Sequence, residues 1–523
     1  MINRQTTYDK WKNFWAENWP VAAILFFTVC TRLFALNRLP AGVLPDEAYG
    51  AYNAWGLMTE GLDSRGYRYP VYFVAWGSGM SVLYSYLAIP MFLLFGTNIF
   101  AYRLPQAIVG ICTVYGMYRL GRELFDKKTA LLLAFALAVN PWHIMNTRFG
   151  LDANMAPGMF VIGLMFLVSG IKKKGSNLIW SAVFLGAALY CYALTWIVIP
   201  FFLLLCILLF WKKIPDNRYA LIFPLLLFLI ALPLLLFVLI NVGLLEEIRT
   251  SFFSIPKLVA FRGQELDIAH LGGSLKELIK MVLTQYSEHS HVTSELVGMY
   301  YLFTTPFMML GVILHVISLL RHYKNGDNDL QFVFLLWLLS AGMMCVLNEN
   351  ITVIHINMLH IPIIFYGVYG IVRTADYIKN KWFLPAVLVF WCVSFVFFFQ
   401  DYIVAQSNSG YFVDDRADEA LERAKEIAGE EGTVSVFDFT IIKYSYLLWY
   451  EKFPVSDYFQ NVVYEEDDAW AEMLSYGRYR YVRYIEDVTE DGVYIIYCNR
   501  AEEFRNLGFD VERVNDLYYI AVR

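Results

Sequence analysis

Residues 38–55 read RLPAGVLPDEAYGAYNAW, and they place two adjacent carboxylates, Asp46 and Glu47, directly behind an apolar segment. That segment, residues 19–37, is long enough to cross the hydrocarbon core of a bilayer. Because Asp46 follows Pro45 and precedes a helical pattern, it could cap a helix, with Glu47 near the positive end of the helix dipole. Alternatively, one carboxylate is a general base at the membrane surface and the other orients an acceptor or binds a cation.

The composition indicates a membrane protein with a soluble C-terminal part. Of the 523 residues, 58% are hydrophobic, and the mean hydropathy is +0.47, which is more apolar surface than a soluble core absorbs. Residues 401–523 carry 26 acidic and 12 basic side chains, whereas residues 1–400 are net basic. We therefore predict a membrane domain over residues 1–400 and an acidic domain over residues 401–523. Six of the seven cysteines lie in apolar segments, so no disulfide framework is expected.

Eleven apolar segments are predicted to cross the membrane as helices: 19–37, 102–121, 129–147, 155–171, 178–194, 195–211, 219–241, 301–320, 330–347, 355–372 and 383–400. The stretch SVLYSYLAIPMFLLFG, residues 81–96, has only 16 residues and contains Pro90. We interpret it as an interfacial or half-embedded helix, because a full crossing there would turn the basic loops outward, against the positive-inside rule. The N-terminus is then cytoplasmic.

The predicted topology places the chemically suggestive residues on the outer face of a plasma membrane. They lie in the loops 38–101 and 242–300, at Arg103 and in residues 148–152 and 348–357 at the ends of spans. The C-terminal domain lies on the same side. It contains an amphipathic helical pattern at 418–428 and strand-like runs at 433–439, 478–486, 492–499 and 516–523, which predict a small α/β domain. It has no glycine-rich phosphate loop, so nucleotide binding is not expected. No nucleic-acid partner is expected either.

Two arginines are predicted to lie at outer membrane edges. Arg103 occurs in YRLP and Arg148 in RFGLD. Each could extend toward lipid headgroups, as long basic side chains do near helix ends. Beside an acidic pair, however, two guanidinium groups would suit a phosphate leaving group, because arginine keeps its proton. Asp152 is either a second acidic member of the site or the N-cap of the span that begins near residue 155.

Other candidate residues have plain structural alternatives. His355 and Asn357 begin a span and could be solvated helix-start residues or headgroup ligands. Arg262, in the long outer loop, is either a substrate contact or a surface charge. Tyr49 and the other tyrosines could stack on sugars, but an interfacial aromatic belt is the default interpretation.

A histidine pair in the same loop has a pattern that is found in metal sites. His289 and His291, with Glu288 and Glu295, form an H-x-H pattern that can bind a transition metal. Without a clear third ligand, a solvated loop is the better interpretation, so a divalent metal is possible but not indicated.

The order of these motifs resembles the GT-C class of membrane glycosyltransferases, specifically the protein O-mannosyltransferase and aminoarabinose-transferase-like branch. The resemblance covers roughly residues 19–372 and is strongest over 38–160. Its motifs are LPDEAY (44–49), YRLPQAIVG (102–110), GRELFDKKTALLLAFALAVNPW (121–142), TRFGLD (147–152), WLLSAGMM (337–344) and INMLHIPIIFYGVYGI (356–371).

This resemblance implies residue roles and a donor. Asp46 corresponds to the catalytic aspartate, Glu47 to its partner, and Arg103 and Arg148 to arginines on the phosphate side. The donor is a sugar on a polyprenyl or dolichyl monophosphate, and direct displacement inverts the anomeric carbon. The acceptor is an envelope glycan, a lipid or a protein. Because the chain lacks the large inserted domain of eukaryotic protein mannosyltransferases, a bacterial envelope polymer or lipid is favoured.

Two other classes of function stay open from the sequence. A transporter or flippase of lipid-linked sugars would bind through the same charges, although transporters usually show internal repeats and midplane charges, which this sequence does not. A non-catalytic envelope scaffold would leave the acidic pair with a capping role only.

Overall fold

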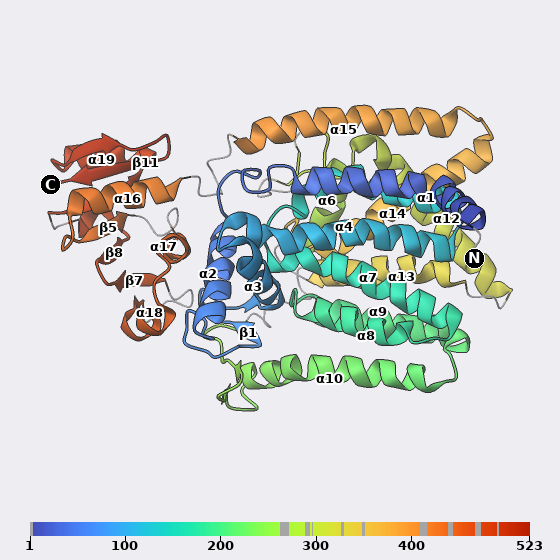
Figure 1. Ribbon diagram of the computed structural model, residues 1–523, viewed down its shortest axis with the longest axis horizontal. Helices are drawn as coiled ribbons and strands as arrows, with labels where there is room; N and C mark the ends of the chain where they lie inside the picture. The colour runs from blue at the N-terminus through green and yellow to red at the C-terminus, as the bar shows by residue number, and fades with distance from the viewer. Residues whose placement is uncertain are drawn as a thin grey trace.

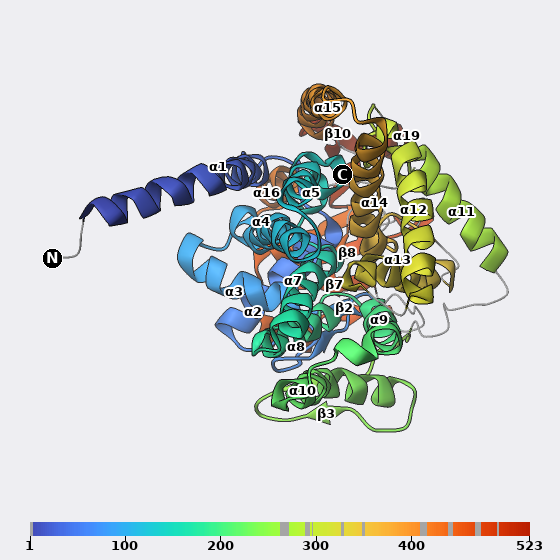
Figure 2. The same ribbon diagram turned by 90° about the vertical axis from the view of Figure 1, so that its right-hand side faces the viewer.

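The computed structural model describes residues 4–261, 271–287, 293–294, 296–325, 329–347, 351–407, 416–437, 443–465, 472–488 and 491–523. Long helices run side by side in a bundle, and the C-terminal part lies at one end of it, next to α2 (Pro45–Thr59) (Figure 1). Seen along the bundle, the first helix extends away from the other helices at its N-terminal end (Figure 2).

Each of the predicted spans coincides with a helix of the bundle. These helices are α1 (Arg4–Leu33), α4 (Ile99–Leu124), α5 (Lys127–Val139), α7 (Asp152–Lys173), α8 (Asn177–Leu189), α9 (Thr195–Phe210), α10 (Arg218–Asn241), α12 (Thr305–Lys324), α13 (Val333–Leu347), α14 (Asn357–Ile378) and α15 (Phe383–Ser407). The short α6 (Pro141–Asn146) follows α5 inside the predicted span 129–147. The stretch 81–96 forms the 13-residue α3 (Leu83–Phe95).

Six helices among the described residues are long and apolar enough to cross a membrane. They are α7, α9 with the turn that continues it to Lys213, α10, α12 with the turn that precedes it from Leu302, α14, and α15 up to Val404. The remaining crossings stay predictions. The helices α7 and α14 are mostly buried in the bundle, whereas α10 and α15 expose most of their apolar side chains, as lipid-facing helices do.

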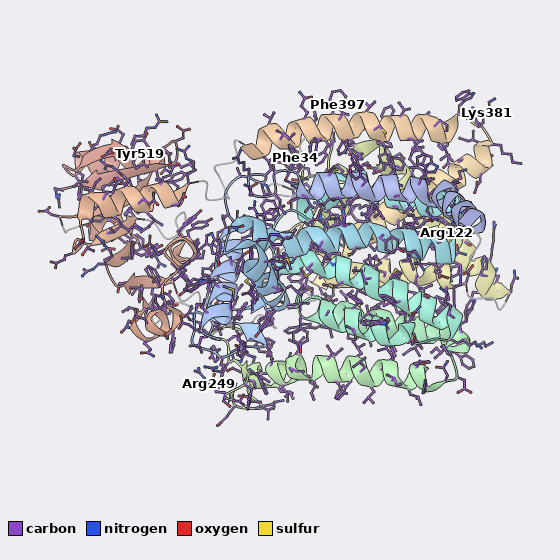
Figure 3. All side chains as sticks on the ribbon, in the orientation of Figure 1. Phe34, Arg122, Arg249, Lys381, Phe397 and Tyr519 are labelled. Carbon is purple, nitrogen blue, oxygen red and sulfur yellow. The ribbon has the colours of Figure 1, made fainter. Side chains whose placement is uncertain are left out.

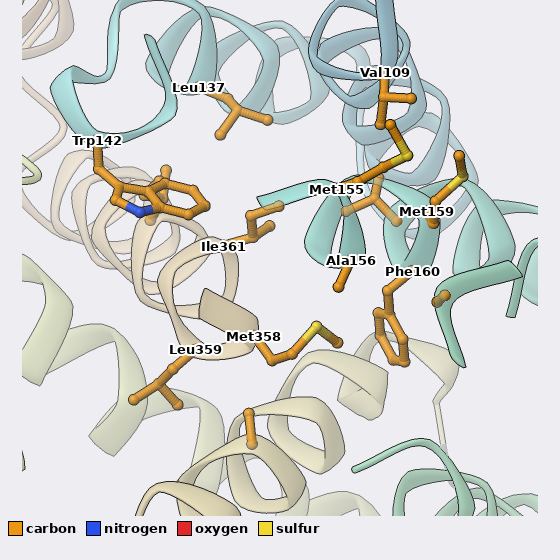
Figure 4. Packing of buried hydrophobic residues seen from close by; sticks show 14 of the residues in the cluster. Val109, Leu137, Trp142, Met155, Ala156, Met159, Phe160, Met358, Leu359 and Ile361 are labelled. Carbon is orange, nitrogen blue, oxygen red and sulfur yellow. The ribbon is translucent and has the colours of Figure 1, made fainter. Parts of the chain in front are cut away.

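The centre of the bundle is packed by apolar side chains of α4, α7 and α14. Figure 4 shows Phe160 of α7 near Met358 of α14, and Met155 of α7 near Val109 of α4. A second contact joins α12 to α14, where Gly311 and Gly370 let the two backbones touch. A Cβ atom at Gly370 would lie 2.0 Å from the carbonyl oxygen of Phe307, so only glycine fits there.

The end of the bundle next to the C-terminal part carries the short elements. The hairpin-like pair β1 (Tyr72–Phe73) and β2 (Met80–Ser81) lies between α2 and α3, and the pair β3 (Ile248–Arg249) and β4 (Ser254–Ile255) follows α10. The amphipathic α11 (Leu271–Thr284) precedes α12.

The C-terminal part contains a mixed seven-stranded sheet with the strand order β10-β11-β9-β5-β8-β7-β6. The central β5 pairs in parallel with β8 and β9, and the other neighbours are antiparallel. The strands are β5 (Val434–Phe437), β6 (Val463–Tyr464), β7 (Met473–Tyr476), β8 (Tyr479–Val482), β9 (Val493–Tyr497), β10 (Asp510–Arg513) and β11 (Tyr518–Val522).

Helices cover both faces of this sheet. On one face, Val434 and Val436 pack with α16 (Ala417–Ala428), and on the other, Phe437 packs with Phe504 of α19 (Ala501–Asn506). This alternation along β5 follows from the two-residue period of a strand.

The C-terminal part is attached to the C-terminal half of α2. The hydroxyl group of Tyr52 donates a hydrogen bond to the carbonyl oxygen of Phe453 (2.8 Å). The carboxylate of Glu60 accepts hydrogen bonds from the backbone N–H groups of Val455 (2.7 Å) and Ser456 (2.9 Å), at the N-terminus of α18 (Val455–Asn461). Glu60 therefore caps a helix that lies almost 400 residues later in the chain.

Candidate functional site

The first turn of α2 holds the two adjacent carboxylates in different environments. The N-cap of α2 is Leu44 and Pro45 is the first helical residue, so Asp46 is not the N-cap. Instead, Glu47 reaches back to the N-terminus of the helix, where its Oε2 accepts a hydrogen bond from the backbone N–H of Leu44 (3.2 Å). Glu47 is fully buried, whereas Asp46 is exposed. Of the pair, only Asp46 faces solvent.

Glu47 is engaged by Arg103 of α4 in a buried, bidentate ion pair. Nε and Nη2 of Arg103 donate to Oε1 (2.9 Å) and Oε2 (2.8 Å) of Glu47. Oε1 also accepts a hydrogen bond from the backbone N–H of Gly150 (2.6 Å). The charged carboxylate is thus stabilised by charge and by hydrogen bonds at once, which a buried ion needs.

The rest of the Arg103 guanidinium binds the backbone of the loop between α1 and α2. Nη1 donates to the carbonyl oxygens of Leu36 (3.3 Å) and Pro40 (2.9 Å), and Nη2 donates to that of Gly42 (2.7 Å). All five N–H groups of the guanidinium are therefore used inside the protein.

Arg148 binds the backbone at the C-terminal end of α1 and in the same loop. We call Arg103 and Arg148 the two clamps on residues 31–42. Nη1 donates to the carbonyl oxygens of Thr31 (2.7 Å) and Arg32 (3.1 Å), and Nη2 donates to those of Phe34 (2.6 Å) and Leu39 (2.7 Å). Nε donates to the hydroxyl group of Tyr402 on α15 (3.2 Å). Together, the two arginines bind seven carbonyl oxygens between residues 31 and 42.

This arrangement revises both sequence-based interpretations of the arginines. Arg103 and Arg148 are buried, with 0% and 1% of their surface exposed, so neither extends toward headgroups and the snorkelling interpretation is wrong. Neither has an N–H left for a phosphate in this structure. Their common effect is to hold the segment that leads into Asp46.

Sequence reasoning missed a third buried arginine. Arg32, at the C-terminal end of α1, donates to the carbonyl oxygens of Ala138 (2.5 Å) and Leu137 (3.2 Å) and contacts Nδ1 of His143 (2.7 Å). The only signal in the sequence is a charged residue in the last turn of an apolar span, which is equally typical of an exposed helix end.

Asp152 lies at the first position of α7 and links this helix to β2. Its Oδ2 accepts a hydrogen bond from the backbone N–H of Ser81 (2.8 Å), and its Oδ1 accepts one from that of Ala153 (2.7 Å). The N-cap of α7 is Leu151, so Asp152 is not the cap. Asp46 and Asp152 are close enough for an electrostatic interaction. The structure thus brings a second carboxylate toward Asp46.

Asn357 braces the start of α14 against the start of α7. Its side-chain amide donates to the carbonyl oxygen of Ala153 (3.3 Å) and to Oδ1 of Asn154 (3.2 Å), and it is buried. Gln106 and Asn146 extend the same buried network, because both donate to the carbonyl oxygen of Asn154 (2.9 and 3.2 Å). These amides bind the first turn of α7, which begins at Asp152. The sequence analysis did not single out Asn154, Gln106 or Asn146.

His355 is half-buried and lies two residues before Asn357. Its backbone N–H donates to Oγ1 of Thr352 (3.3 Å). Arg262 lies outside the described residues, as do His289, His291, Glu288 and Glu295, and the predictions for them stay predictions. Among the residues that are described, no group of three or more His, Cys, Asp or Glu side chains could hold a metal ion.

Tyr49 lies inside the protein, not at a lipid interface. Its hydroxyl group donates to the carbonyl oxygen of Val74 (2.6 Å) and accepts from Oγ of Ser64 (2.9 Å). Burial raises the pKa of Tyr49 to about 12, because the phenolate is disfavoured away from water. Its ring lies near those of Trp76 and Tyr444, with centroids 5.0 and 6.4 Å away. Tyr49 therefore joins the segment between α2 and α3 to the C-terminal part.

The candidate site consists of the exposed carboxylate of Asp46 in the first turn of α2, and contacts with several other elements fix that turn. An exposed aspartate can accept a proton or bind a hydroxyl group, and a rigid first turn keeps it in one place. The buried ion pair, the two clamps on residues 31–42 and the attached C-terminal part restrict that turn.

The comparisons with known proteins agree with this architecture. Residues 80–240 match the family model described as dolichyl-phosphate-mannose-protein mannosyltransferase. The structure of ArnT from Cupriavidus metallidurans bound to undecaprenyl phosphate is similar over 96% of this chain and 97% of that chain, with 11% identity and a TM-score of 0.59. No curated protein matches the sequence significantly.

A second similar structure is the oligosaccharyltransferase AglB of Archaeoglobus fulgidus, solved with an inhibitory peptide and a dolichol-phosphate. It matches 85% of this chain with 13% identity and a TM-score of 0.52, and this chain spans 64% of its length. The resemblance to GT-C membrane glycosyltransferases is thus confirmed, and at these identities it establishes the fold.

Proposed function

We propose that the protein is an inverting glycosyltransferase that moves a sugar from a polyprenyl-monophosphate donor to an acceptor at the outer face of the membrane. The observation that carries this proposal is that the two adjacent carboxylates lie in different environments. Glu47 is neutralised by Arg103 in the interior, which leaves Asp46 exposed on a fixed turn. The GT-C fold supports the choice of reaction class, and ArnT, which shares that fold, was solved with undecaprenyl phosphate.

In the proposed reaction, Asp46 removes the proton from an acceptor hydroxyl group or amine. The resulting nucleophile forms a bond to the anomeric carbon while the bond from that carbon to the phosphate oxygen breaks. The polyprenyl phosphate leaves with the electron pair of that bond. A single displacement inverts the configuration of the anomeric carbon.

Arg103 and Arg148 act as positioning residues in this proposal. Their donors are used by Glu47, Tyr402 and the backbone of residues 31–42, so they hold Asp46 in place instead of touching the donor. Arg262 and His355 stay candidates for contact with the donor headgroup. The acceptor is an envelope glycan, a lipid or a protein, and an envelope polymer or lipid is our preferred class.

The outer-face location is supported by the distribution of charge. Arg122 and Lys381 lie at the end of the bundle opposite to the C-terminal part (Figure 3). Basic residues favour the cytoplasmic side, so the C-terminal part and Asp46 are assigned to the extracytoplasmic side of the plasma membrane.

Transfer of radiolabelled sugars from a panel of polyprenyl-phosphate donors to candidate acceptors, by purified protein in liposomes, tests the proposal. Asp46→Asn is expected to lower turnover about 100- to 10,000-fold, the usual contribution of a general base, with unchanged donor binding. Asp376→Asn, on α14 at the opposite end, is the matched control. Wild-type turnover in Asp46→Asn would refute the role of Asp46. Movement of donors between leaflets without transfer would assign a transporter.

A further inference from the structure

A basic pocket lies at the end of the bundle opposite to the Asp46 site. It has a volume of about 300 Å³ and lies between the C-terminal ends of α7 and α9 and the turn before α13. Its polar lining consists of four lysines and one aspartate: Lys172, Lys174, Lys212, Lys213 and Asp329. Because α7 has 22 residues and rises about 1.5 Å per residue, the pocket is about 33 Å along α7 from Asp152.

The charge of this pocket is strongly positive. Its carboxylate, Asp329, is engaged by Gln331, whose backbone N–H and side-chain amide donate to it (3.2 and 3.1 Å). Within the described part of the chain, neither Lys174 nor Lys212 makes an ion pair. Lys174 is the C-cap of α7, and its backbone carbonyl oxygen accepts a hydrogen bond from the side-chain amide of Asn217 (3.0 Å). An anion would complement this cluster.

An apolar groove begins where the basic pocket ends. The groove has a volume of about 380 Å³ and lies between α7, α8, α9 and α10. Ile171 and Ile214 line both spaces, so the two adjoin. A space that suits a negative charge therefore lies beside a space that suits a hydrocarbon chain.

The length of the groove matches one leaflet of a bilayer. Along α9, its lining runs from Phe210 at the basic end to Ile199, which is 11 residues or about 16 Å of helix. Half of a hydrocarbon core of about 30 Å is about 15 Å. A lipid chain that starts at the basic pocket would therefore fill the groove to about the middle of the membrane.

We propose that these adjoining spaces bind an anionic phospholipid, with its phosphate beside Lys174 and Lys212 and an acyl chain in the groove. The positive-inside rule explains why lysines lie at this end of the bundle, but it does not explain why they surround a pocket that adjoins an apolar groove. Basic pockets between membrane helices are typical sites for anionic headgroups. The site is separate from the Asp46 site and does not depend on the proposed transferase reaction.

Native mass spectrometry of the delipidated protein, titrated with phosphatidylglycerol or phosphatidylcholine, tests this proposal. The wild type is expected to prefer phosphatidylglycerol. Lys174→Gln/Lys212→Gln is expected to weaken its binding about 30-fold, which corresponds to about 2 kcal/mol for two lysines. The matched control is Lys379→Gln/Lys381→Gln, which removes the same charge from the turn between α14 and α15, outside this pocket.

Two further arms separate a lipid from a free anion. Ala231→Trp narrows the groove without changing the charge, and it is expected to weaken phosphatidylglycerol binding while the protein stays folded by its melting temperature. Inorganic phosphate is expected to compete poorly. Equal affinity for the two lipids, an equal loss in the control variant, or competition by phosphate at concentrations equal to those of the lipid would overturn the proposal.

Discussion

Arg103 and Glu47 are joined by two parallel hydrogen bonds of 2.9 and 2.8 Å, and both side chains are completely buried. Attraction in the interior is strong, but so is the cost of removing each ion from water. The pair is therefore stable only as long as both members are present.

Glu47→Gln is expected to destabilise the protein by about 3–5 kcal/mol, because it leaves the Arg103 charge uncompensated in the interior. Thermal unfolding in detergent measures this effect. Asp46→Asn, which changes the exposed neighbour, is the control and should unfold like the wild type. A Glu47→Gln protein that is fully stable but inactive would instead indicate that Glu47 takes part in the reaction.

Arg148→Lys separates positioning from phosphate binding. A lysine has three N–H donors on one atom, so it cannot replace a guanidinium that binds four carbonyl oxygens and Tyr402. We expect a lower melting temperature and a lower kcat with little change in the donor KM. A higher donor KM at unchanged stability would support direct contact with the phosphate.

Glu60 is expected to control attachment of the C-terminal part. Glu60→Ala removes the acceptor for two N–H groups of α18, and loss of a cap typically costs about 0.5–2 kcal/mol. Hydrogen exchange of residues 455–461 should accelerate, and Glu430→Ala, an exposed glutamate of the same part, is the control. Unchanged exchange in Glu60→Ala would show that the aromatic contacts are sufficient for attachment.

Asp63 is expected to make the stability of the segment between α2 and α3 depend on pH. Burial raises the pKa of its carboxyl group to about 7, despite hydrogen bonds from the backbone N–H groups of Tyr67 and Arg65 that oppose the shift. A folded pKa above the unfolded value means that the folded state binds the proton more tightly. Stability should therefore fall as the pH rises from about 4 to about 7.

Melting temperatures across that pH range test this prediction in the wild type and in Asp63→Asn. The variant is expected to lose this part of the pH dependence, because asparagine keeps an acceptor oxygen and does not titrate in this range. The same slope in both proteins would assign the pH dependence to another group.

The positions of the bundle helices could be predicted from the sequence because each lies in a continuous apolar run. Whether the side chains of Arg103 and Arg148 are exposed or buried could not be predicted in the same way. An arginine at the end of a span can face headgroups or the interior, and the outcome depends on which backbone carbonyls the loop between α1 and α2 presents to it. That loop has no regular pattern from which its path could be inferred.

The tyrosines give a second example. An interfacial aromatic belt is the default interpretation of the tyrosines near the first span, which include Tyr49 and Tyr52, because aromatic residues near spans usually form one. In the structure, these two tyrosines bind the segment between α2 and α3 and the C-terminal part. The partner of Tyr52 is Phe453, which lies 401 residues later in the chain. No local pattern encodes such a contact. By contrast, the position of Asp46 at the start of a helix could be predicted from the neighbouring residues in the sequence.

The clamps on residues 31–42 also constrain the order in which the molecule can be made. The loop that precedes Asp46 is bound by Arg103, by Arg148 and, through Arg148, by Tyr402 of the last helix of the bundle. A ribosome synthesises the loop first and these partners much later. The turn that carries Asp46 therefore reaches its final form only when the last helix has entered the membrane, so an incompletely inserted chain holds no finished site.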